Sequence, residues 1–142
     1  MRSNASNPIL LVEDNPDDLF FMQRALGKTG LLDRLVAVAD GQEAISYLSG
    51  TGKFANRAKH PLPALVLLDL QLPYFTGLEV LEWAREQPQL SEVPIVVLSS
   101  SQQRSDQERA FALGARAYFP KPTEPGLLGE LIEQLRCEYL QG

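Results

Sequence analysis

Three short apolar runs, each ended by a polar residue, constrain the fold of this chain more than any other feature. They occupy residues 9–12, 64–68 and 95–98. Such an unbroken apolar run is typical of a strand that is buried on both faces of a parallel sheet. Open sheets of this kind bind ligands at the carboxyl ends of their strands, so the residues that follow the runs mark an expected site.

The residues at these ends carry carboxylates, a hydroxyl and an amine. Glu13 and Asp14 follow the first run, Asp69 the second, Ser99 the third, and Lys121 follows a shorter run at residues 117–119. Each also has an ordinary explanation, as a residue that starts a helix, a loop acid, a helix cap or a surface lysine. Because all of them are expected at one edge of one sheet, we interpret them as a single site.

Helix signals lie between the apolar runs. Asn15, Asp40 and Thr76 each stand as an N-cap before a helical pattern, and two further helices are predicted at about residues 103–113 and 125–139. With a short β-branched run near residue 36, strands and helices alternate strictly. This alternation predicts an α/β fold with five parallel strands, five helices and right-handed crossovers.

Size and charge narrow the class of protein. The chain has 142 residues, which favours a single domain over residues 1–142, with a core at about 8–140 and a polar tail at 1–7. The net charge of −5 argues against nucleic acid or anionic lipid as the main partner. A single cysteine, Cys137, and the lack of a signal peptide or a membrane-spanning run indicate a cytoplasmic protein.

One connection is longer than this fold requires. Residues 50–63 join the second predicted helix to the third strand, where about 2–6 residues are usual. The segment carries Lys53, Arg57, Lys59 and His60 but no acid. It is either a surface excursion or a docking element for an acidic partner.

The expected cluster of carboxylates needs a counter-charge. Two carboxylates about 5 Å apart repel by about 3 kcal/mol at an effective dielectric constant of 20. Lys121 supplies only one positive charge, whereas Mg²⁺ accepts several carboxylates and keeps a side open for phosphate. A carboxylate beside such a cation is suited to attack phosphorus and form an aspartyl phosphate.

Five stretches of the sequence resemble the receiver domains of two-component response regulators. They are residues 10–15, 67–73, 77–81, 94–99 and 114–122. The resemblance extends over residues 8–140, and it implies the flavodoxin-like doubly wound sheet with strand order 2-1-3-4-5 and helices on both faces. Residues 40–44 and the long segment 50–63 are most similar to small stand-alone receivers that serve phytochrome-type and other sensor kinases.

The resemblance also implies roles for individual residues. Asp69 accepts a phosphoryl group from a phosphohistidine on a sensor histidine kinase or a histidine phosphotransfer protein. Mg²⁺ is bound by Asp14 and Asp69, by Glu13 through water and by the backbone carbonyl of Gln71. Ser99 and Lys121 contact the phosphoryl oxygens, and Tyr118 takes the position of the switch aromatic residue.

Several positions depart from the most frequent family pattern. Glu13 replaces Asp, and Ser99 replaces Thr, which removes a methyl group from the contact with Tyr118. Pro120 removes a backbone donor, so we expect the fifth strand to be short or at a sheet edge. The Lys121–Pro122 peptide bond is expected to be cis, as the resemblance implies.

We expect the signal to leave through protein contact, because no output domain follows the last predicted helix. The expected surface is the fourth helix, the fifth strand and the fifth helix, which would bind a downstream protein or a second copy of the chain. Two alternatives are an unphosphorylated scaffold with the same fold and a phosphohydrolase with an Asp nucleophile. The hydrolase normally has a second Asp two residues after the nucleophile, where this chain has Gln71.

Overall fold

A five-stranded parallel sheet forms the centre of the computed structural model, which describes residues 7–140. The strands are β1 (Ile9–Val12), β2 (Leu35–Val38), β3 (Leu65–Leu68), β4 (Ile95–Ser99) and β5 (Ala117–Pro120). Their order is β2-β1-β3-β4-β5, and every pair is parallel, so the predicted fold class and strand order are confirmed. Of the polar tail expected at residues 1–7, all but Asn7 lie outside the described residues.

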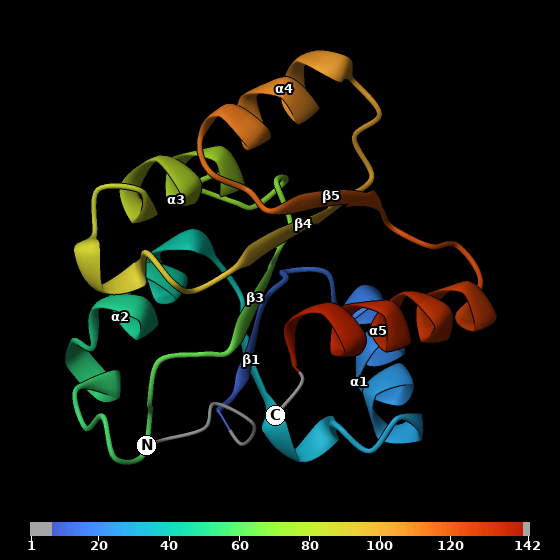
Figure 1. Ribbon diagram of the computed structural model, residues 1–142, viewed down its shortest axis with the longest axis horizontal. Coiled ribbons are helices and arrows are strands. Elements are labelled where there is room, and N and C mark those ends of the chain that lie inside the picture. The colour runs from blue at the N-terminus through green and yellow to red at the C-terminus, as the bar shows by residue number, and fades with distance from the viewer. Residues whose placement is uncertain (1–6, 141–142) are drawn as a thin grey trace.

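Helices cover both faces of this sheet (Figure 1). They are α1 (Pro16–Lys28), α2 (Gly41–Ser49), α3 (Gly77–Ala84), α4 (Arg104–Ala112) and α5 (Pro125–Tyr139), with short 3₁₀ helices η1 (Leu32–Arg34), η2 (Gly52–Phe54) and η3 (Pro88–Leu90). One layer contains α1 and α5, and the other contains α2, α3 and α4 (Figure 1).

Alternate residues of each central strand supply the two halves of the core. In β1, Leu10 and Val12 pack on the α2–α4 side, whereas Ile9 and Leu11 pack on the α1–α5 side. All four side chains are buried, as the unbroken apolar run predicted. A strand apolar on both faces can stand only between two helical layers, so this pattern fixes the position of β1 inside the sheet.

The N-caps foreseen in the sequence start three helices. The Asn15 side chain accepts hydrogen bonds from the backbone at the start of α1, and Asp40 accepts one from the N–H of Glu43 at the start of α2. Thr76 and Glu79 form a complete capping box for α3. These caps hold the first turns of α1 and α3 beside the carboxyl ends of β1 and β3, where the candidate site lies.

β5 is an edge strand, as the proline at its end predicted, although it is no shorter than β1, β2 or β3. Pro120 pairs with Ser99 at the last position of the β4–β5 register. Side chains of β5 are partly buried or exposed, unlike those of β3 and β4. A missing backbone donor is tolerated at an edge, because no further strand needs it.

The long connection at residues 50–63 packs against α2 instead of extending into solvent. Arg57 donates hydrogen bonds to the carbonyl oxygens of Tyr47, Leu48 and His60 at 2.7, 2.6 and 3.0 Å. The Phe54 ring lies in edge-to-face contact with the rings of Tyr47 and His60. Arg57 thus caps the last turn of α2, and the role of the segment as a docking element for an acidic partner stays a prediction.

Tyr74 in the β3–α3 connection has a strained backbone. Its φ is 65°, the one positive value among non-glycine residues of the described chain, and its side chain is 96% exposed. A large residue in the left-handed region carries about 1–2 kcal/mol of strain, which asparagine tolerates better. We expect Tyr74→Asn to raise the free energy of unfolding by about 0.5–1 kcal/mol.

Urea denaturation would measure this gain, with Tyr74→Phe as the matched control. Phenylalanine keeps the Cβ atom and the ring, so the control should leave the midpoint unchanged. An equal effect of both substitutions would show that the hydroxyl, and not the backbone conformation, is responsible.

Candidate functional site

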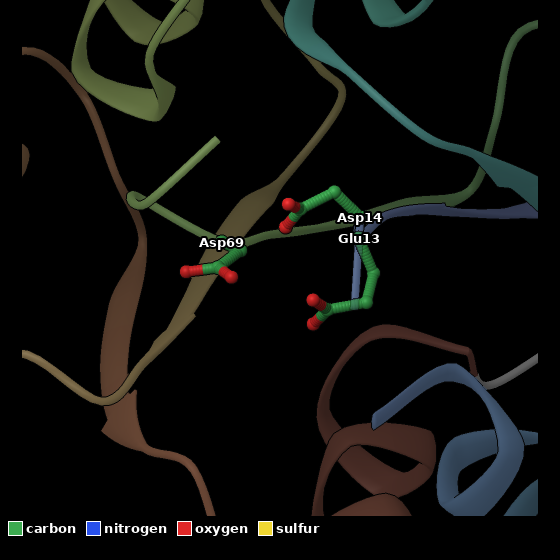
Figure 2. Close-up of side chains that lie close together, drawn as sticks. All are labelled: Glu13, Asp14 and Asp69. Atoms are coloured by element: carbon green, nitrogen blue, oxygen red, sulfur yellow. The ribbon is translucent and has the colours of Figure 1, made fainter. Parts of the chain in front are cut away.

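Three carboxylates meet at the carboxyl ends of β1 and β3. Oxygen atoms of Glu13, Asp14 and Asp69 all lie within 4.8 Å of one another, and Figure 2 shows the three side chains around one gap. The register of the sheet explains the approach: Val12 pairs with Leu68, so the residues that follow them emerge side by side. The predicted meeting of these acids from distant parts of the chain is therefore confirmed.

Burial differs among the three acids. Glu13 and Asp69 are 6% and 5% exposed, whereas Asp14 is exposed. The Asp69 carboxylate accepts a hydrogen bond from the backbone N–H of Gln71 at 3.0 Å, and Glu13 accepts one from Asn15 at 3.1 Å. These backbone bonds hold both buried carboxylates toward the common gap.

Lys121 reaches into the same cluster from the end of β5. Its Nζ lies 2.9 Å from Glu13 Oε1 and 2.9 Å from Asp69 Oδ2. A third carboxylate, that of Asp18 in the first turn of α1, lies 2.8 Å away. Asp18 was not predicted as a site residue from the sequence, because an acid at the start of a helix is already explained by the helix dipole.

The Lys121–Pro122 peptide bond is trans, so the expectation of a cis bond is wrong. The trans form is the intrinsically preferred one even before proline. Lys121 still enters the cluster, because its backbone N–H donates to the carbonyl oxygen of Ser99 at 3.0 Å and continues the pairing of β5 with β4.

The pKa values of two members of the cluster, Glu13 and Lys121, are both raised. A raised pKa disfavours the charged form of the glutamate but favours the charged form of the lysine. Burial raises the pKa of Glu13 above its ordinary value, although Lys121 and the backbone of Asn15 oppose the shift. Burial alone would lower the pKa of Lys121, but its bonds to Asp18, Asp69 and Glu13 outweigh this and raise that pKa. Lys121 is therefore charged at neutral pH, and burial disfavours the charged form of Glu13.

Ser99 ends β4, and Tyr118 lies in the neighbouring strand β5, where it pairs with Val97. The Ser99 side chain is fully buried, and its Oγ accepts a hydrogen bond from the Ser101 N–H at 3.1 Å. The hydroxyl of Tyr118 donates to the Ser101 carbonyl oxygen at 3.0 Å. Within residues 7–140, the Ser99 hydroxyl makes no hydrogen bond to the carboxylates, so the structure places Ser99 near the cluster without bonding it to the acids.

Gln71 follows Asp69 and faces the β4–α4 connection. Its side-chain Oε1 accepts a hydrogen bond from the Ser100 hydroxyl at 2.6 Å. This bond ties the loop after β3 to the loop after β4.

A pocket of about 100 Å³ adjoins the carboxylates on the α1–α5 side, and its lining includes Glu13, Asp69 and Lys121.

The donor set of the cluster fits a hard divalent cation. Glu13, Asp14 and Asp69 offer only oxygen ligands, and Lys121 neutralises one of their three negative charges. Mg²⁺ and Mn²⁺ both prefer such ligands.

The described residues include no helix long and apolar enough to cross a bilayer.

Comparison with known proteins agrees with this geometry. The family model of the response regulator receiver domain matches residues 9–133. Response regulator Rcp1 of Synechocystis sp. is 34% identical over 143 aligned positions, which cover 98% of this chain and 95% of Rcp1.

Two solved structures are similar over nearly the whole length. The phosphorylated cyanobacterial phytochrome response regulator RcpA has a TM-score of 0.86 and 35% identity, with 95% of this chain and 94% of that one covered. The Mn²⁺-bound form of Rcp1 has a TM-score of 0.83 and 33% identity, with 95% of both chains covered. The chain described here belongs to the family of response regulator receiver domains.

Proposed function

We propose that this protein is a single receiver domain over residues 1–142 that acts as a phosphoacceptor switch, with Asp69 as the acceptor. The observation that carries the proposal is the convergence of Glu13, Asp14, Asp69 and Lys121 at one edge of the sheet. The donor is the phosphohistidine of a sensor histidine kinase or a histidine phosphotransfer protein. The similarity to RcpA, a cyanobacterial phytochrome response regulator, supports this class of partner.

In the proposed transfer, an Asp69 carboxylate oxygen attacks the phosphorus atom. An O–P bond forms as the P–N bond to the donor imidazole breaks, and the imidazole leaves with the electron pair of that bond. The Lys121 ammonium, 2.9 Å from Asp69, is positioned to neutralise charge on the phosphoryl oxygens. Ser99, at the end of the neighbouring strand β4, would donate a hydrogen bond from its hydroxyl group to one of these oxygens.

Mg²⁺ is the proposed cofactor. Asp14 and Asp69 would hold it with their carboxylates, Glu13 through water, and Gln71 with its backbone carbonyl oxygen. When bound, the cation supplies charge stabilisation to the transferring group. The Mn²⁺-bound Rcp1 structure and the all-oxygen donor set support a divalent cation here.

The proposed output surface is formed by α4, β5 and α5. Phosphorylation adds nearly two negative charges beside Ser99 and Lys121. Movement of Ser99 toward the phosphoryl group would lengthen the hydrogen bond that its Oγ accepts from the Ser101 N–H, and the carbonyl oxygen of Ser101 accepts a hydrogen bond from the Tyr118 hydroxyl. Tyr118 would report this change to a downstream protein or to a second copy of the chain, in the cytoplasm.

A small phosphodonor tests the proposal. With acetyl phosphate and Mg²⁺, we expect labelling that approaches one phosphoryl group per chain and disappears when EDTA removes the cation. Sustained release of phosphate at many turnovers per chain would instead indicate a phosphohydrolase. No labelling under any condition would indicate an unphosphorylated scaffold and would overturn the proposal.

A further inference from the structure

Asp18 shares the Lys121 ammonium with the two buried acids of the site. Its Oδ2 lies 2.8 Å from Nζ, and the corresponding distances to Glu13 and Asp69 are both 2.9 Å. A lysine ammonium has three N–H donors, so three carboxylates satisfy it fully. Glu13 and Asp69 also belong to the group of acids that can hold a cation, whereas Asp18 does not.

We propose that Asp18 is a positioning residue that holds Lys121 on the α1 side of the cluster and so limits its competition with a divalent cation for Glu13 and Asp69. The inference rests on the cation site of the proposed function. It assigns to the first turn of α1 a part in setting the affinity of that site.

The position of Asp18 is fixed independently of Lys121. The Asn15 side chain accepts hydrogen bonds from the backbone N–H groups of Asp17 and Asp18 at 2.9 and 3.0 Å. The amino end of α1 stabilises a carboxylate at this point. Asp18 thus offers Lys121 a fixed anchor.

Solvent exposure separates Asp18 from the other two partners of Lys121. The Asp18 side chain is 41% exposed, while those of Glu13 and Asp69 are both 5% exposed. A buried carboxylate needs a cationic partner far more than an exposed one does. Without Asp18, the ammonium would therefore bind only to the two buried acids, which are also proposed to face the divalent cation.

Asp17 provides a matched control for this contact. It lies in the same turn of α1, is capped by the same Asn15 oxygen and carries the same charge. Among residues 7–140, Asp17 forms no ion pair. Asp17→Asn and Asp18→Asn therefore remove equal charge from the helix start, and only the second removes the anchor of Lys121.

Titration with Mn²⁺, without any phosphodonor, tests the inference. We expect Asp18→Asn to raise the dissociation constant about fivefold to tenfold, and Asp17→Asn to change it less than about twofold. Asp18→Glu keeps the charge on a longer arm and should restore most of the affinity. Circular dichroism would establish that all variants are folded.

A double-mutant cycle in EDTA tests the contact without metal. Asp18→Asn should lower the urea midpoint more than Asp17→Asn does when Lys121 is present, and by the same amount as Asp17→Asn when Lys121→Met has removed the ammonium. If Lys121→Met does not fold, rescue of Mn²⁺ affinity by Asp18→Glu decides the question instead.

Three outcomes separate the possibilities. Equal effects of Asp17→Asn and Asp18→Asn on Mn²⁺ affinity would overturn the role of Asp18 while leaving the proposed function intact. Failure of Asp18→Glu to restore affinity would do the same. Absence of saturable Mn²⁺ binding in the wild type would overturn the cation site itself and this inference with it.

Discussion

Asp69→Asn is expected to reduce labelling by a small phosphodonor by at least about 100-fold, because an amide oxygen is a far weaker nucleophile than a carboxylate. The change is nearly isosteric and removes one of two buried carboxylates that lie close to each other. The fold should therefore survive the substitution, and the loss should be one of chemistry. Phosphorylation would be followed on a gel that retards the phosphorylated chain, or by intact mass.

Asp33→Asn is the control for this experiment. Asp33 is exposed in η1, immediately before β2, and so lies at the amino ends of the strands. Asp33→Asn changes the net charge by the same amount as Asp69→Asn does, but it leaves the acid cluster intact. Labelling of Asp33→Asn should equal that of the wild type. Continued stoichiometric labelling of Asp69→Asn would place the acceptor on another side chain, with Asp14 the first to examine.

Much of the fold could be predicted because the relevant signals are local. An apolar run such as residues 64–68 specifies a buried strand wherever it stands, and the caps at Asn15 and Thr76 act within one helical turn. The strict alternation of strands and helices then leaves few topologies. Strand order itself came from the family resemblance, since hydrophobic periodicity does not say which strands are neighbours.

The site was predictable only in part, because two of its features depend on distant contacts. The acids after β1 and β3 could be foreseen, since parallel strands end at one edge. Asp18 could not, because its distance to Lys121 depends on how α1 packs beside the end of β5. One signal in the sequence could have identified Asp18. It lies in the first turn of the helix that follows β1, and side chains in such a turn lie close to the carboxyl end of the preceding strand.

The bond of Gln71 to Ser100 was missed for the same reason. Side chains of two different loops form it, and each loop position depends on its own strand end. The trans peptide bond between Lys121 and Pro122 is a different case. The cis isomer was expected from the family resemblance alone, and the bond adopts the ordinary trans isomer.

Lys121→Met should have the largest effect on stability. In the absence of divalent cations near neutral pH, we expect the free energy of unfolding to fall by about 3 kcal/mol. The substitution keeps a side chain of similar length but leaves the buried carboxylates of Glu13 and Asp69 without their cation. Urea denaturation in EDTA would measure the loss, with Lys53→Met as the control, since Lys53 is 70% exposed and its ion pair with Glu43 contributes little.

The pH dependence of this loss has a definite sign. Lys121 has a raised pKa in the folded protein, so its contribution is fully present below its ordinary value of 10.5 and disappears only at higher pH. Glu13 also has a raised pKa, and the loss of Lys121 removes interactions that lower it. As pH falls toward the ordinary glutamate value of 4.5, the variant can protonate Glu13 and relieve the unpaired charge. The difference between wild type and Lys121→Met should thus be greatest near pH 7–9 and shrink toward pH 5.

Divalent cations should reverse the defect, because they supply the charge that the lysine no longer provides. Lys121 is the one residue among 7–140 that forms an ion pair with Asp69, so without its ammonium the three carboxylates have no competing cation from that part of the chain. Millimolar Mn²⁺ should therefore stabilise Lys121→Met more than it stabilises the wild type, through preferential binding to the folded state. An equal loss of stability at pH 5 and pH 8, or an equal response of both proteins to Mn²⁺, would show that Lys121 packs at this edge without neutralising it. In that case the acids would need another counter-charge, and the electrostatic basis of the proposed switch would have to be abandoned.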